Sequence, residues 1–192
     1  MRKRKVKQLG SGTIASNPGE FQLSQKLLSR LRPDLYGIRG YFKNKRDYKK
    51  SGLTIIDAIE QQLKFGDCRA AIVINTSPCL IAAYTDELDC VAILHLSKKL
   101  AKKYRFKQTD RLLTVNSYNN KDHPDLKQGP NATGRYTGFN PIIVNLVCED
   151  TEAIRLREST ITSQEWLRTM NLGREYRNHY PAINRPAIPS FY

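Results

Sequence analysis

Long apolar runs are absent from this chain. The longest, residues 79–84, has six residues, whereas a membrane-spanning helix needs about 20. The N-terminal residues MRKRKVK are basic like the start of a secretory signal peptide, but the apolar stretch that must follow them is missing. We therefore expect a soluble, cytoplasmic chain that makes no membrane contact.

Residues that commonly carry catalysis or bind metals are also few. The chain has three histidines and four cysteines, and no cysteine belongs to a CxxC pair or has a histidine at ligand spacing. The GxSxG, HExxH and GxGxxG motifs are missing, as is a Gly-Lys-Ser/Thr phosphate loop. Because no motif fixes a reaction, we favour a non-enzymatic protein with no cofactor and no metal. Four residues are predicted to be reduced thiols in the core, namely Cys68, Cys79, Cys90 and Cys148.

Charge of one sign dominates what is present. The chain has 192 residues, of which 40% are hydrophobic, and a formal net charge of +14. Residues 1–50 hold 14 Lys/Arg against 3 Asp/Glu, whereas residues 51–100 hold 4 against 6. A chain of this length buries a core without disulfides, so its middle is typical of an ordinary folded body. The excess of positive charge near the N-terminus predicts a negatively charged partner.

The hydrophobic patterns divide the chain into three parts. Residues 1–16 are basic and then Gly/Ser-rich, which predicts a flexible arm. Residues 17–175 carry the periodic apolar positions of one folded domain. Residues 176–192 contain three prolines near the C-terminus and no helical face, so we expect an extended tail. We find no internal repeat.

The strand signals lie in the middle of the chain. Short β-rich runs at 70–76, 79–85 and 90–96 are separated by small turns, which predicts an antiparallel meander. Two further strands are predicted at 112–118 and 141–148, with a loop over 119–140 between them. The fold class is therefore α+β, a single compact domain with a mainly antiparallel sheet of about five strands and flanking helices.

The helix signals lie before, among and after these strands. Asn17 to Glu20 has the pattern of a capping box, with leucines at 23, 27, 28 and 31 on one face. Thr54 with Asp57, Ser97, Thr151, and Thr162 with Glu165 mark four more helix starts, and Gly66 is predicted to end the helix that Thr54 begins. A break between the last two helices is expected near residues 159–161. Residues 36–50 mix glycines, aromatics and basic residues, which predicts a loop or a short strand.

Three clusters of basic residues are candidate nucleic-acid contacts. Lys and Arg neutralise phosphates, and interleaved aromatics offer faces for base stacking, although each cluster is also compatible with an ordinary solvated surface. No RNP-type, KH, zinc-finger or helix-turn-helix signature accompanies them. The candidates are Arg2, Lys3, Arg4, Lys5 and Lys7; Tyr41, Lys43, Lys45, Arg46, Tyr48, Lys49 and Lys50, with Phe42 interleaved; and Lys102, Lys103, Arg105 and Lys107, with Tyr104 and Phe106 interleaved.

Two acidic or polar segments offer alternative chemistry. The turn at 86–89 holds Asp86, Glu87 and Asp89, and carboxylates at a hairpin tip are typical ligands of hard cations, but Asp is also a common turn residue. The 119–140 loop holds His123 between two aspartates, which suits acid–base work. It also holds Arg135 between glycines, which suits a phosphate. An exposed loop with neither role explains the same residues.

These observations leave three hypotheses for function. The first is an accessory protein that binds a polyanion, RNA or DNA, through the three clusters and Arg135. The second is an interaction subunit or immunity-type binder of an acidic protein. The third is a metal-dependent hydrolase or nuclease that uses Asp86, Glu87, Asp89 and His123. The oligomeric state is not predicted.

Overall fold

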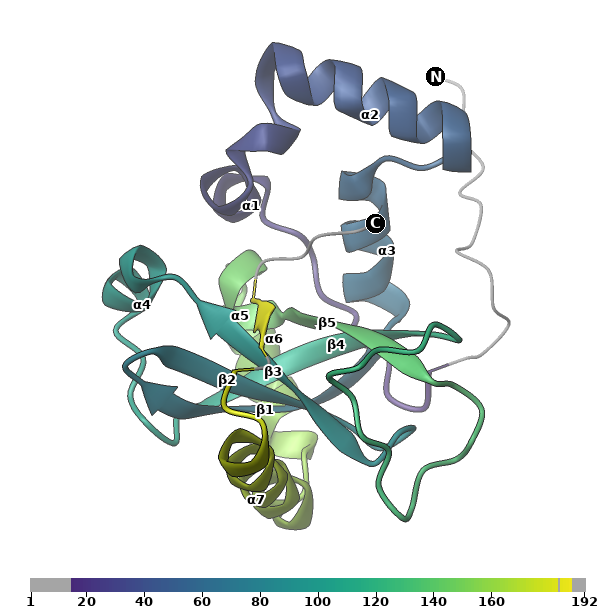
Figure 1. Ribbon diagram of the computed structural model, residues 1–192. Coiled ribbons are helices and arrows are strands. Elements are labelled where there is room, and N and C mark those ends of the chain that lie inside the picture. The colour runs from purple at the N-terminus through teal and green to yellow at the C-terminus, as the bar shows by residue number, and fades with distance from the viewer. Residues whose placement is uncertain (1–14, 183, 188–192) are drawn as a thin grey trace.

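The computed structural model describes residues 15–182 and 184–187, and it confirms the α+β class. A six-stranded sheet in the order β5-β4-β1-β2-β3-β6 occupies the centre, with helices above and below it in Figure 1. The sheet is mixed but mostly antiparallel, because only the short β6 runs parallel to its neighbour. It has six strands where about five were expected.

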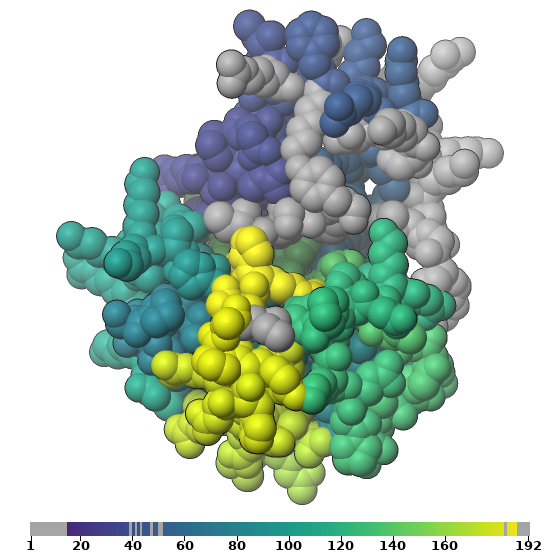
Figure 2. All heavy atoms as spheres, in the orientation of Figure 1, coloured from purple at the N-terminus to yellow at the C-terminus, as the bar shows by residue number. Residues whose placement is uncertain are grey.

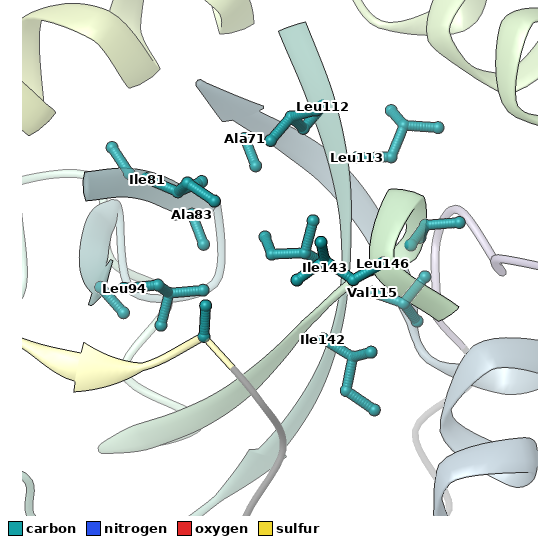
Figure 3. Close-up of a cluster of buried hydrophobic side chains, with 14 of the residues drawn as sticks. Ala71, Ile81, Ala83, Leu94, Leu112, Leu113, Val115, Ile142, Ile143 and Leu146 are labelled. Carbon is teal, nitrogen blue, oxygen red and sulfur yellow. The ribbon is translucent and has the colours of Figure 1, made fainter. Parts of the chain in front are cut away.

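The predicted meander is confirmed. Strands β1 (Asp67–Thr76), β2 (Cys79–Thr85) and β3 (Cys90–Leu96) pair antiparallel in sequence order, and β4 (Arg111–Asn119) pairs with β1 on the other side. Nearly every position of β2 and β3 is buried, as their continuous apolar sequence indicates. Ala71, Ala83 and Leu112 are cross-strand partners and lie in the apolar cluster of Figure 3. The four cysteines are free thiols and buried.

The two edges of the sheet differ from the prediction. Strand β5 (Gly138–Ile143) begins and ends earlier than residues 141–148, because residues Val144–Val147 form a helical turn, α5. Strand β6 (Arg185–Pro186) was not predicted and pairs with β3. The Arg185 guanidinium donates to the backbone carbonyl of Phe139 on β5 at 2.9 Å. The two edge strands are therefore linked, and the sheet is curled.

Most helix boundaries follow the predicted caps. Helix α3 (Ile55–Phe65) has the full capping box between Thr54 and Asp57 and ends at Gly66, and α4 (Lys98–Tyr104) is capped by Ser97. Helices α6 (Thr151–Thr160) and α7 (Ser163–His179) are separated at Ile161, and Thr162 caps α7. Because α7 extends to His179, the first residues of the expected tail are helical.

The first helix begins later than its capping pattern indicates. Helix α1 spans Gln25–Leu31 and is capped by the Ser24 hydroxyl. The preceding segment is extended, since the backbone N–H groups of Gly19 and Phe21 donate to the carbonyls of Gly66 and Leu63. These bonds hold the segment against the end of α3 and leave no helical partner for its amides. The predicted start at Asn17 was therefore wrong.

Residues 36–50 form a helix instead of a loop or strand. After a short 3-10 turn, η1 (Pro33–Leu35), helix α2 runs from Gly37 to Ser51. Gly37 and Gly52 have positive φ angles of 70° and 75° and lie at the two ends of the helix, where glycine costs little. Gly40 is buried, and a Cβ there would lie 2.3 Å from the Leu35 backbone. The glycines that suggested a loop thus lie at the ends of this helix and at its contact with the Leu35 backbone.

Helix α7 packs closely on one face of the sheet, below it in Figure 1. Trp166, Thr169, Gly173 and Tyr176 form its buried side. A Cβ on Gly173 would lie 2.6 Å from the Ala82 Cβ and 3.0 Å from a methyl carbon of Ile74. The close approach of α7 to β1 and β2 therefore depends on Gly173, which has no Cβ, and on the small side chain of Ala82.

Gly173→Ala should destabilise the protein, by about 1–3 kcal/mol from overpacking. The sign is informative, because the same change at an exposed helix position is expected to stabilise by about 1 kcal/mol. Urea unfolding measures the difference. Asn171→Ala, at an exposed position of the same helix, is the control and should change stability little. Unchanged or raised stability in Gly173→Ala would mean that the helix does not approach the sheet this closely.

Candidate nucleic-acid interface

Helix α2 presents apolar and basic side chains to solvent together. Ile38 is 80% exposed, Phe42 63% and Tyr48 55%. Lys45 and Lys49 are exposed too, and they share the helical face of Ile38 and Phe42 by their spacing. Large exposed apolar side chains beside cations are typical of a contact surface. The helix as a whole holds six Lys/Arg and one Asp.

Helix α4 supplies a second exposed basic surface. All of the predicted cations in and after this helix are exposed: Lys102, Lys103, Arg105 and Lys107, together with Lys98 and Lys99. The aromatics interleaved with them are placed differently. Tyr104 and Phe106 are partly buried and stack with ring centroids 5.4 Å apart, and the Tyr104 hydroxyl donates to the Leu146 carbonyl. These rings anchor α4 to the body, so they are poor candidates for base stacking.

Helix α1 lies between the two basic helices. Arg30 is exposed. Burial raises the pKa of Tyr104, and the nearby charge of Arg30 opposes that shift only in part, which places Arg30 close to α4. At the other end of α1, η1 packs against both α1 and α2. Figure 2 shows α4, α1 and α2 following one another up one side of the molecule. The described residues of the second and third predicted clusters therefore lie on the same side of the molecule, with α1 between them.

The remaining predicted contacts have different outcomes. The first cluster, Arg2 to Lys7, lies outside the described residues, as do the side chains of Tyr41, Lys43 and Lys50. Arg135 is 64% exposed but lies at the loop beside the acidic turn, with its guanidinium 3.8 Å from Glu87. The basic surface therefore consists of exposed residues on three helices: Arg30, Lys45, Arg46, Lys49, Lys98, Lys99, Lys102, Lys103, Arg105 and Lys107.

The acidic turn has arginine partners from elsewhere in the chain. Asp89 is buried and forms a bidentate pair with Arg168 of α7, with both N–O distances 2.5 Å. Arg69 of β1 lies between the carboxylates of Asp86, at 2.5 Å, and Asp67, at 2.7 Å. Within residues 15–182 and 184–187, no three His, Cys, Asp or Glu side chains are placed to hold a metal ion. The turn is thus built as a set of ion pairs.

The 119–140 loop lies directly on this turn. Asn131 donates from its backbone and its amide to Asp89, and Thr133 donates to Glu87 at 2.6 Å. The loop is held from the other side by Arg185, which forms a bidentate pair with Asp125. Arg185 and Asp125 are 60 residues apart in the sequence, and Arg168 and Asp89 are 79 residues apart. No local pattern in the sequence signals pairs that are so widely separated.

His123 packs within the loop beside Gly138. Its Nε2 atom is buried with no hydrogen-bond partner among the described residues, and its ring packs where a Cβ on Gly138 would lie. Burial and the charge of Arg185 lower the pKa of His123. Both effects favour the neutral form of the ring, which packs within the loop.

The acids around the turn have pKa values that shift in opposite directions. Burial alone would raise the pKa of Asp89, but hydrogen bonds from Arg168 and Asn131 outweigh it and hold that pKa below its usual value. Burial raises the pKa of Asp86, and the charge of Arg69 only partly offsets this. Burial likewise raises the pKa of Glu165, which accepts a hydrogen bond from the Ala70 amide.

Comparisons of the chain with family models, with curated proteins and with solved structures found no match. In the part of the chain that the structure describes, no helix is long and apolar enough to cross a membrane. The basic surface and the ion-paired turn are the two features of the described chain that bear on function.

Asp89→Asn should destabilise the protein at neutral pH, by about 1–3 kcal/mol, because it removes the charge that pairs with Arg168. A depressed native pKa stabilises the fold above the unfolded pKa, near 3.9, and this stabilisation is lost as the pH falls through the native value. The difference between variant and wild type should therefore shrink in acid. Urea unfolding as a function of pH measures it. A difference that is constant with pH would contradict the ion pair.

Asp86→Asn is the matched comparison, because the pKa of Asp86 is raised instead of lowered. Where a carboxyl group has a higher pKa in the folded protein than in the unfolded chain, the protein loses stability as the pH rises above the unfolded pKa. The variant should therefore gain stability relative to wild type as the pH rises from acid to neutral, opposite in sign to Asp89→Asn. Parallel pH profiles for the two variants would show that the two carboxylates do not differ in environment.

Proposed function

We propose that this protein is a non-enzymatic accessory protein that binds single-stranded RNA or DNA through the surface of α1, α2 and α4. The observation that carries the proposal is the outer face of α2, where Phe42 and Tyr48 are more than half exposed beside Lys45 and Lys49. Cations neutralise phosphates, and exposed aromatic faces stack with bases. Both chemistries are present on one helix.

The distribution of ion pairs supports the same proposal. Around the acidic turn, positive charge is used internally, since Arg69 and Arg168 pair with carboxylates of the body. On α1 some charge is used in the same way, because Lys26 contacts Glu149. The lysines of α4 face solvent in a segment, residues 98–107, that contains no acidic residue. An external polyanion is the partner that this excess charge favours.

Removing pairs of lysines tests the electrostatic part. Lys45→Gln/Lys49→Gln and Lys99→Gln/Lys103→Gln should each weaken binding of a labelled single-stranded oligonucleotide. If each lysine contacts one phosphate, each pair should also lower the slope of log affinity against log salt by about 1.4. Fluorescence anisotropy over a salt series measures both quantities. Arg155→Gln/Lys121→Gln removes two exposed cations from α6 and the long loop and should leave the slope unchanged. Equal losses in all three variants would contradict a localised interface.

Removing the aromatics tests the stacking part. Phe42→Ala and Tyr48→Ala should each weaken single-strand binding by about 1–3 kcal/mol per stacked base. They should affect a duplex of the same sequence much less, because its bases are already stacked on one another. Phe65→Ala is the control, since Phe65 is 50% exposed at the far end of α3. Loss of duplex and single-strand binding to the same extent would leave only charge as the basis of binding.

A further inference from the structure

A hollow of about 370 Å³ lies between the start of α7 and the end of the sheet formed by β1 and β4. Its lining combines apolar and polar side chains from strands, a connecting turn and a helix that are far apart in sequence. The lining residues are Ile72, Thr109, Arg111, Ser163, Trp166, Leu167 and Met170. Ile72 and Trp166 are buried within the protein, whereas Leu167 is 62% exposed at the rim. The hollow thus has an apolar floor and an apolar edge that faces solvent.

Arg111 gives this hollow a positive charge that lies over an aromatic ring. Its guanidinium carbon lies 5.0 Å from the centroid of the Trp166 ring, and the side chain is exposed. No carboxylate of the described residues forms an ion pair with it. This separates Arg111 from Arg69, Arg168 and Arg185, each of which pairs with an acid of the body.

A guanidinium that lies over an aromatic face is well placed to receive a carboxylate. The ring covers one side of the group, and its N–H donors can form two parallel hydrogen bonds with a carboxylate. The hydroxyl-bearing residues Thr109 and Ser163 line the same hollow. A group that suits this site therefore has a negative charge next to a bulky apolar moiety.

The shape of the hollow distinguishes a peptide from a small molecule. Sites for small molecules usually have volumes of about 300–1,000 Å³ and bury most of the ligand surface. This hollow is at the lower limit of that range, and a rim residue that is 62% exposed does not enclose a free ligand. A single side chain of a larger partner needs no such enclosure, because the rest of the partner covers the rim.

We propose that this hollow, on the α7 side of the sheet, is a docking site for an acidic segment of a partner protein. The segment inserts a bulky aliphatic or aromatic side chain over Ile72 and Trp166, against Leu167 and Met170, and places an Asp or Glu carboxylate on Arg111. Charge complementarity selects the acidic partner, because the exposed Arg174 follows the partly buried Met170 by one turn of α7 and adds a second positive charge near Arg111. None of the lining residues belongs to the α1, α2 and α4 surface, so the proposal does not depend on nucleic-acid binding.

Trp166 makes this proposal directly measurable, because it is the one tryptophan in the chain. The probes are peptides selected from a displayed library of random 12-residue sequences on the immobilised full-length protein and then synthesised. Selected peptides should carry Asp or Glu beside Leu, Ile or Phe, and each should change the fluorescence of Trp166 on titration. Absence of this pattern, or binding without a change in Trp166 fluorescence, would overturn the proposal.

Three variants locate the binding site. Arg111→Glu and Leu167→Ser should each weaken the selected peptides by about tenfold or more, as expected for loss of a charge-assisted contact or of the apolar rim. Arg155→Glu, which makes the same charge change on α6, should leave affinity unchanged. Circular dichroism and urea unfolding establish that the variants are folded. Affinity that is insensitive to Arg111→Glu, or equally reduced by Arg155→Glu, would overturn the proposal.

A single-stranded oligonucleotide provides the last arm of this experiment. It should bind without changing Trp166 fluorescence and without sensitivity to Arg111→Glu, because its proposed contacts lie on the other helices. A Trp166 response to the oligonucleotide that Arg111→Glu abolishes would assign the hollow to nucleic acid and overturn peptide docking. Absence of any oligonucleotide binding would count against the proposed function and leave the peptide result intact.

Discussion

The bidentate pair between Arg168 and Asp89 is the interaction on which much of this structure depends. It joins α7 to the turn between β2 and β3, and the same carboxylate accepts two hydrogen bonds from Asn131 of the long loop. Helix, turn and loop are therefore fixed by one buried acid. Around it, Arg69 pairs with Asp67 and Asp86, and Arg185 pairs with Asp125. Asp67, Asp89 and Asp125 are buried, and their burial requires such partners because an unpaired buried carboxylate is costly.

Because arginines pair with the acids around the turn, the paired charges lie in one part of the molecule and the exposed positive charges in another. The acids near the turn are neutralised within the body, so they contribute little to the field outside it. Lys45 and Lys49 of α2 and the lysines of α4 remain exposed at the other side of the fold, with α1 between the two helices. Arg111 is a smaller case of the same kind, since its cation lies over Trp166 without an acid of the described chain. The proposed nucleic-acid surface and the proposed peptide site both follow from positive charge that is exposed to solvent.

The sequence predicted the parts of the fold that local chemistry determines. Alternating turns and β-rich runs gave the meander, and the Thr54, Ser97 and Thr162 caps marked three helices, because these signals act within a few residues. Helix α2 was missed because its glycines lie at its ends and at the contact with Leu35, which only the folded chain reveals. The ion pairs and the loop contacts were missed for a related reason: Arg168 and Asp89 are 79 residues apart. For the candidate interface, the sequence patterns identified most of the cations, but they missed Arg30, Lys98 and Lys99 and the partly buried positions of Tyr104 and Phe106.

In the proposed complex, single-stranded nucleic acid lies across α2 and α4 with bases against Phe42 and Tyr48. Photo-crosslinking with an oligonucleotide that contains thio-substituted uridines, followed by mass spectrometry of the digested protein, locates the bound strand. Adducts are expected in the α2 peptide that contains Phe42 or Tyr48, reduced by added salt and by the Lys45→Gln/Lys49→Gln change. Adducts confined to α7 or to the 119–140 loop, with none in α2, would contradict this arrangement.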